Sequence, residues 1–286
     1  MKDERSTLFY AYRYFIIHSG QQSLFKEKRE LIKELVDRCI LERKLEINIE
    51  NRKHLLIHAR TFSDNVQLFK FSKDIPVTKF MLDEKTSDII ESKESNYPFI
   101  FIFIDTSKQM ILLEKKTSVY NTIKQSEHVF KTFVDSYYFD PNYTFTMDEI
   151  TDNSSFWSNI ERSEKIYELT LNLKSPNLFG GILETNSFLK KVKEKLNNEE
   201  TDIKVKNSKG ELTINHETLD DPLKYASSGG GHWELKLKRK GRSRKTVVKS
   251  ECCVKTIEVT RFEEEYTMFP EHGILEKIKN IDELLD

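Results

Sequence analysis

The chain has few of the residues that point to disulfides or zinc. Its 286 residues include three cysteines, and two of these, Cys252 and Cys253, are adjacent. Neighbouring residues of a strand point to opposite faces, and three cysteines cannot form a complete disulfide set. No Cys-x-x-Cys pair or Cys/His cluster is present, which disfavours structural zinc. We therefore expect a protein of the reducing cytoplasm.

Long apolar runs and an excess of charge of one sign are also missing. No uninterrupted apolar segment reaches 18 residues, so the sequence predicts no transmembrane helix. The 46 basic and 47 acidic residues give a formal net charge of −1, so any attraction to nucleic acid must come from a local cluster. With 37% hydrophobic and 33% charged residues, the composition favours a globular protein with a densely charged surface.

The hydrophobic pattern predicts an α+β protein with two domains, each a mainly antiparallel sheet packed with amphipathic helices. Apolar residues recur at helical spacing over residues 24–44 and 118–139, whereas residues 45–71 contain three runs of strand-like composition. The Asp-Pro-Asn sequence at 140–142 is expected to end the second helix. We therefore expect an N-terminal domain over 1–141 and a C-terminal domain over 142–286.

Residues 97–116, YPFIFIFIDTSKQMILLEKK, predict a β-hairpin. Two β-rich apolar runs flank a polar turn that begins at Asp105. The first run is apolar at every position, which is typical of a strand buried on both faces near the middle of a sheet.

The same hairpin contains the residue types of a metal-dependent nuclease. Asp105, Glu114 and Lys116 match the order Asp…Glu-x-Lys, in which two carboxylates hold Mg²⁺ and the lysine stabilises developing charge. We expect hairpin geometry to bring Asp105 and Glu114 together. Charged residues also end apolar strands in many proteins, and the nine-residue separation is short for the motif. A Mg²⁺-dependent enzyme is therefore an alternative hypothesis. The leading hypothesis, given below, assigns no catalytic residue and no metal.

The strongest local charge is a basic hairpin over residues 236–249. It has no acidic residue between Glu234 and Glu251, and its turn is expected at Gly241. Alternation predicts that Trp233, Leu235 and Leu237 face one way while the lysines between them face the other. A protruding cationic hairpin suits phosphate contacts, although lysines also protect edge strands from aggregation. The expected nucleic-acid-binding residues are Lys236, Lys238, Arg239, Lys240, Arg242, Arg244, Lys245 and Lys249.

Two further motifs receive structural interpretations. His54 and His58 share a strand face, but no third ligand follows them, so we expect packing or hydrogen bonding. The sequence SSGGGH at 227–232 does not match a P-loop or a dinucleotide fingerprint. We expect it to be a flexible connector that orients the basic hairpin.

The order of elements resembles one known family. The segments HLLIHARTF, VQLFKF, YPFIFIFIDTSKQMILLEKKTSVY and YTFTMDEIT follow one another as in the N-terminal half of RexA-type proteins of the lambda phage abortive-infection system, and in similar prokaryotic phage-defence proteins. The resemblance covers roughly residues 45–175. It implies a cytoplasmic homodimer that binds DNA without strong sequence preference, acts in phage sensing and works alongside a membrane protein. It brings no catalytic residue, and the basic hairpin lies outside it.

Three hypotheses follow. The leading one is a non-enzymatic, sequence-tolerant nucleic-acid-binding sensor or adaptor in prokaryotic antiviral defence. The second is the metal-dependent nuclease described above. The third is a protein-interaction scaffold of a defence complex, in which the basic hairpin meets an acidic partner.

Overall fold

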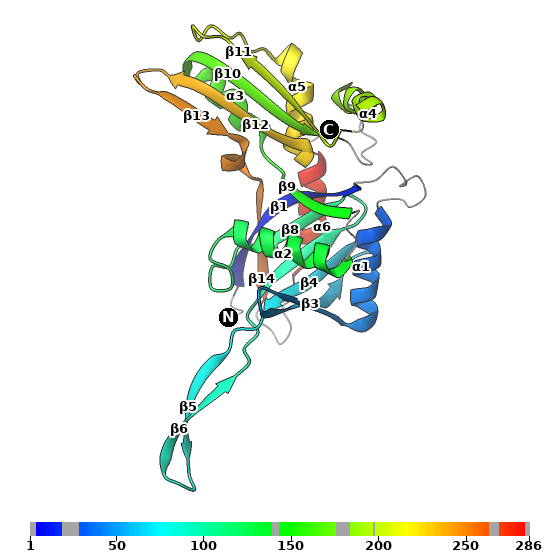
Figure 1. Ribbon diagram of the computed structural model, residues 1–286, viewed down its shortest axis with the longest axis vertical. Helices are drawn as coiled ribbons and strands as arrows, with labels where there is room; N and C mark the ends of the chain where they lie inside the picture. The colour runs from blue at the N-terminus through cyan, green and yellow to red at the C-terminus, as the bar shows by residue number, and fades with distance from the viewer. Residues whose placement is uncertain are drawn as a thin grey trace.

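The computed structural model describes residues 4–18, 29–138, 143–175, 184–196, 198–262 and 269–283. Their strands form one large sheet, a four-stranded sheet and a two-stranded arm that projects from one end of the molecule (Figure 1). All named strand pairs are antiparallel, and helices cover the two larger sheets, so the predicted α+β class is confirmed.

The large sheet has the order β14-β1-β8-β7-β4-β3-β2, and β9 also pairs with β1. Its strands are β1 (Glu4–His18), β2 (Lys44–Ile49), β3 (Arg52–Thr61), β4 (Val66–Lys73), β7 (Phe99–Asp105), β8 (Met110–Glu114), β9 (Tyr143–Glu149) and β14 (Thr256–Phe262).

Strand β7 is buried on both faces, as its apolar sequence predicts. Ile100, Ile102 and Ile104 belong to a core on one side of the sheet, and Phe101 and Phe103 belong to the core on the other side. Alternating side chains of one strand fill both layers because the strand lies inside the sheet with β4 and β8 as its neighbours. The predicted hairpin of β7 and β8 is confirmed.

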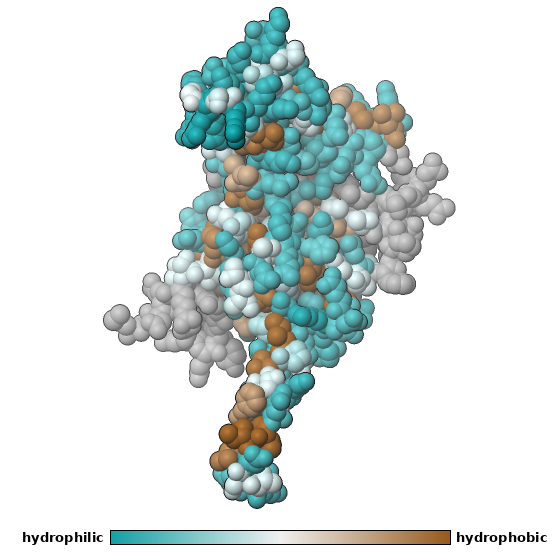
Figure 2. Space-filling model, turned by 60° about the vertical axis from the view of Figure 1, so that its left-hand side comes forward, coloured by the Kyte–Doolittle hydropathy of each residue, from teal (hydrophilic) through white to brown (hydrophobic). Residues whose placement is uncertain are grey.

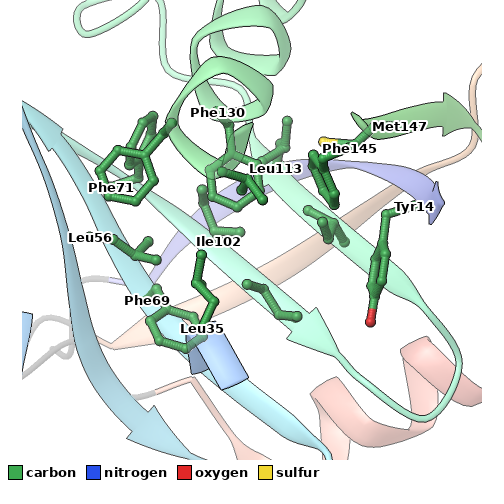
Figure 3. Close-up of a cluster of buried hydrophobic side chains, with 14 of the residues drawn as sticks. Tyr14, Leu35, Leu56, Phe69, Phe71, Ile102, Leu113, Phe130, Phe145 and Met147 are labelled. Carbon is green, nitrogen blue, oxygen red and sulfur yellow. The ribbon is translucent and has the colours of Figure 1, made fainter. Parts of the chain in front are cut away.

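Helices cover both faces of this sheet. On the first face, α1 (Arg29–Glu42) and α2 (Ile123–Tyr138) supply apolar side chains that pack against the isoleucines of β7. Figure 3 shows how Phe130 of α2 and Leu35 of α1 meet Phe71, Ile102 and Leu113 of the strands. The opposite face is covered by α6 (Glu271–Glu283).

The strand pairing does not follow the predicted division into residues 1–141 and 142–286. Strand β9 pairs with the second half of β1, and β14 pairs with its first half. Helix α6 packs on the same sheet, so the C-terminal end of the chain belongs with the N-terminal end. The second sheet is formed by the chain between β9 and β14. Residues 140–142, where the boundary is predicted, lie outside the described residues.

The second sheet has the order β11-β10-β12-β13. Its strands are β10 (Ser163–Lys174), β11 (Glu200–Lys206), β12 (Gly231–Arg239) and β13 (Lys245–Lys249). One face packs against α3 (Asn153–Glu161), α4 (Glu184–Leu196) and α5 (His216–Tyr225) through a separate apolar cluster. Two short elements, η1 (Ala226–Gly230) and η2 (Ser250–Cys253), precede β12 and follow β13.

The arm consists of β5 (Val77–Asp83) and β6 (Asp88–Glu94), which pair only with each other. Its side chains are almost all exposed, in contrast to the strands of the two larger sheets. Figure 2 shows apolar residues gathered on this arm. Short strands rich in charged residues give a weak periodic signal, which explains why the sequence pattern did not predict them.

Phe71 and Phe80 offer a matched test of the core. Phe71 is fully buried, with Tyr120, Phe130 and Phe133 within 6.0 Å of its ring, whereas Phe80 on the arm is 71% exposed. We expect Phe71→Ala to lower the free energy of unfolding by about 3–5 kcal/mol, because it leaves a cavity. Phe80→Ala, measured in dilute protein by urea denaturation, should change it by less than about 0.5 kcal/mol. Equal effects would contradict the assignment of the core.

Candidate nucleic-acid interface

The basic hairpin is confirmed as β12 and β13, joined by a turn at Gly241. Along β12, Trp233, Leu235 and Leu237 are buried against the helices, while Lys236 is exposed on the other face. The predicted alternation of this strand is therefore confirmed. It separates an apolar side that anchors the strand from a polar side that meets solvent.

The strand register extends this polar side across all four strands. Lys206 of β11 pairs with Glu168 of β10, which pairs with Lys236 of β12. One step away, Lys238 of β12 pairs with Lys245 of β13. We call this surface the open face. Its lysines include Lys204, Lys206, Lys236, Lys238, Lys245 and Lys249.

Acidic side chains from β10 and β12 pair with several of these lysines. Glu168 accepts from the Nζ of Lys204 at 2.7 Å, and Glu234 lies 3.2 Å from the Nζ of Lys249. Lys238 is 3.0 Å from Glu164. The four lysines paired in this way, Lys206 included, keep 26–60% of their side-chain surface exposed, so solvent screens each pair and it contributes little to stability. Phosphate oxygens can replace such partners at little cost.

Other cations of the hairpin have no acidic partner in the part of the chain that the structure describes. Lys236, Arg242, Arg244 and Lys245 make no ion pair there. Arg242 and Arg244 belong to the exposed turn between the two strands. These four side chains supply uncompensated positive charge beside the paired lysines.

The remaining two of the eight predicted residues point toward α3. Arg239 donates to the Oδ1 of Asn159 at 3.2 Å, and Lys240 donates to the carbonyl of Glu161 at 2.9 Å. Both are exposed, so their charge still adds to the local potential. Their hydrogen bonds hold the end of β12 against α3.

An aromatic ring lies on the open face among the cations. The Nζ of Lys245 sits 3.8 Å from the ring centroid of Tyr167, which is half-buried at a bulge of β10. Aromatic rings beside cations form stacking platforms for the bases of single-stranded nucleic acids. The sequence pattern did not identify Tyr167, Lys204 or Lys206, although two lysines two residues apart in a predicted strand signal a shared face.

The glycine segment before β12 is a packed junction, so its predicted role as a flexible connector is wrong. Ser227, Gly229 and Gly230 are buried, and Gly229 has a φ of +90°. A Cβ on Gly229 would lie 2.3 Å from the Cβ of Arg13. The Nε of Arg13, a buried residue of β1, donates to the carbonyl of Ser228 at 2.9 Å. The second sheet is thereby held against the large sheet.

The proposed nuclease residues do not converge. Asp105 is next to the β7–β8 turn, and its Oδ1 accepts from the backbone amides of Ser107 and Lys108 at 2.9 and 3.0 Å. Glu114 is at the other end of the hairpin, where it accepts from the amide of Phe101 at 2.7 Å. Phe101 and Asp105 are four positions apart on β7, a distance of about 13 Å along the strand. The expectation that the hairpin brings the two carboxylates together is therefore wrong.

Lys116 and the two histidines also have structural partners. Lys116 donates to the carbonyl of Phe99 at 3.0 Å. The ring of His54 stacks on Phe71, and His58 is 3.3 Å from the Oε1 of Gln67. Burial lowers the pKa of both imidazoles, which favours their neutral forms. Among the described residues, no three His, Cys, Asp or Glu side chains are grouped so that they could hold a metal ion.

Comparison with known proteins adds no functional assignment. No protein-family model matches the chain, and no curated protein matches it at a significant level. Within the described residues, none of the helices has the length and apolar character needed to cross a bilayer. The open face and the sequence resemblance are therefore the features from which a function can be inferred.

Two glycines with positive φ test the junction. Gly229→Ala adds a Cβ against Arg13, whereas Gly241→Ala, at φ +73°, meets no atom within 4 Å. Both variants place a Cβ in left-handed backbone, which costs on the order of 1 kcal/mol. We expect Gly229→Ala to lower the free energy of unfolding by at least about 2 kcal/mol more than Gly241→Ala. Equal losses of unfolding free energy in urea denaturation would contradict the assignment of Gly229 to a tightly packed junction.

Proposed function

We propose that this protein binds nucleic acid without strong sequence preference, through the open face of the second sheet and the turn at Gly241. The observation that carries the proposal is the register. It gathers lysines of β11, β12 and β13 on one side of a sheet whose other side is sealed by helices. A rigid sheet that presents cations in rows is suited to follow a phosphate backbone.

The chemistry of these side chains supports sequence tolerance. Lysine ammonium groups act as point charges, and phosphate contacts carry no direct sequence information. Tyr167 can stack on any base because every base has a π-face. Arg242 and Arg244 in the exposed turn extend the cationic surface beyond the sheet.

The biological setting that we propose is prokaryotic phage defence, with the protein acting as a non-enzymatic sensor or adaptor in the cytoplasm. This part rests on the resemblance of residues 45–175 to RexA-type proteins, which also motivates a membrane-protein partner. The Mg²⁺-dependent nuclease is not carried forward, because Asp105 and Glu114 lie at opposite ends of their hairpin.

A charge-reversal variant tests the binding surface. Lys236→Glu, Arg242→Glu, Arg244→Glu and Lys245→Glu together change four cations that have no acidic partner among the described residues. We expect binding to a single-stranded oligonucleotide to fall at least about 100-fold at moderate salt, and the salt slope to fall by about 3. Fluorescence anisotropy across a salt series measures both.

The control reverses four exposed lysines on helices. Lys33 is on α1, and Lys190, Lys191 and Lys195 are on α4. This variant has the same net charge as the first, so it should lose affinity by less than about threefold if the open face is the binding surface. Equal losses in both variants would contradict the proposal, as would wild-type affinity that does not depend on salt.

A further inference from the structure

The ring of Tyr167 is supported on the open face by the turn that follows β11. Tyr167 lies between Ile166 and Glu168, where β10 carries one residue more than the stretch of β12 that it pairs with. A Cβ on Gly210, whose φ is +78°, would lie 2.8 Å from the Cε1 of Tyr167. The amide of Ile166 donates to the carbonyl of Gly210 at 3.1 Å, and the amide of Asn207 donates to the carbonyl of Tyr167 at 2.9 Å. The turn is therefore joined to the strand, and the missing side chain at Gly210 makes room for the ring.

An exposed cation covers this ring. The Nζ of Lys245 lies 3.8 Å from the ring centroid of Tyr167. Lys245 is exposed and makes no ion pair with a described residue. Cation–π contacts at exposed sites are weak, and the lysine stem is flexible. The ammonium group can therefore move to a phosphate oxygen and leave the ring to a base.

Positive charge covers only the part of the open face near the turn at Gly241. Lys238 lies in the row beside this turn, and Lys204 lies in the last row that carries lysines. The two rows are four positions apart along β12, a distance of about 13 Å. In the next row, Asn172 of β10 pairs with Asp202 of β11 and donates to its Oδ1 at 2.7 Å. The cationic part is short, and it suits a site of about four to six nucleotides.

Charge alone would favour a duplex on this surface. Double-stranded DNA carries one negative charge per about 1.7 Å of helix axis, twice the density of one strand. The bases of a duplex are paired and stacked inside the helix, so their faces are closed to the ring of Tyr167. A single strand exposes these faces, and stacking on an aromatic ring strengthens binding by a factor of about five or more per base. The ring among the cations therefore adds affinity only for unpaired bases.

We infer that the open face binds single-stranded nucleic acid in preference to duplex, a substrate class that rests on the proposed function of the same face. One unpaired base displaces the ammonium group of Lys245 and stacks on Tyr167. The phosphates on either side of that base contact Lys245 and Lys236. The recognised chemistry is an unpaired base on a phosphodiester backbone, which single-stranded DNA and RNA share.

A comparison of strand and duplex tests the substrate class. The probes are a short DNA strand of mixed sequence without self-complementarity, and the blunt duplex that it forms with its complement. We expect fluorescence anisotropy at one moderate salt concentration to show the strand bound at least about tenfold more tightly than the duplex, although the duplex carries more charge. An RNA strand and its duplex repeat the comparison, and preference for the single strand in either chemistry supports the inference.

The ring of Tyr167 is tested by a matched pair of variants. Tyr167→Leu removes the aromatic ring, and we expect it to weaken binding of the single strand at least about fivefold while binding of the duplex stays unchanged. Tyr167→Phe keeps the ring and should bind the strand like the wild type. The salt slope should be the same in both variants, because neither loses a cation.

A strand without bases at its central positions separates stacking from phosphate contacts. The wild type should bind this abasic strand at least about fivefold more weakly than the complete strand, because no base reaches the ring. Tyr167→Leu should bind the two strands with nearly equal affinity. Such coupling between the variant and the missing bases indicates direct contact rather than a change elsewhere in the fold.

Three results would overturn the inference. A duplex bound as tightly as the strand is the first, and a Tyr167→Leu variant that binds the strand like the wild type is the second. If the four-residue charge reversal described above still abolishes binding in these experiments, the proposed function stands and only the substrate class fails. The third result is a wild type that binds neither strand nor duplex, and in that case both fail.

Discussion

The fold depends on the pairing of β1, the longest strand of the molecule. Residues Glu4 to Tyr10 pair with β14, and residues Tyr12 to His18 pair with β9 along the same edge. The other edge of β1 pairs with β8. This strand therefore joins the start of the chain to its C-terminal part. Because β9 and β14 follow one another along the same edge of β1, the chain leaves the large sheet after β9, forms the second sheet and returns at β14. Where the chain leaves and returns, Thr151 forms a bridge with Val254, and the amide of Lys255 donates to the carbonyl of Ile150.

The position of the open face follows from this arrangement. The contacts of Thr151 with Val254 and of Ile150 with Lys255 hold both ends of the segment that forms the second sheet. Arg13 of β1 holds the segment at a third point, through the carbonyl of Ser228. Helices α3, α4 and α5 then seal the apolar side of the second sheet. The polar side of β12 is left with lysines in register with those of its neighbours. The exposed ion pairs there contribute little to stability, so the surface is available for a polyanion.

Local hydrophobic patterns in the sequence predicted the features that depend on a single segment of the chain. The apolar run at Phe99 to Ile104 predicted a strand with two buried faces, and Trp233, Leu235 and Leu237 predicted the two sides of β12. Features that depend on distant pairing were not predicted. Glu168 neutralises lysines of a strand more than thirty residues away, and β14 joins a strand at the opposite end of the chain. Asp105 and Glu114 illustrate the same limit, because only the register shows which ends of a hairpin they occupy.

Lysine footprinting with a single-stranded oligonucleotide tests most directly whether the open face binds nucleic acid. Lysines are acetylated in the free and bound states, and mass spectrometry measures the protection of each one. If the open face binds the strand, Lys204, Lys206, Lys236, Lys245 and Lys249 become protected, and Lys190 and Lys191 of α4 are modified equally in both states. Protection of Lys108 and Lys116 on the β7–β8 hairpin, with the open face unchanged, would contradict binding at the open face.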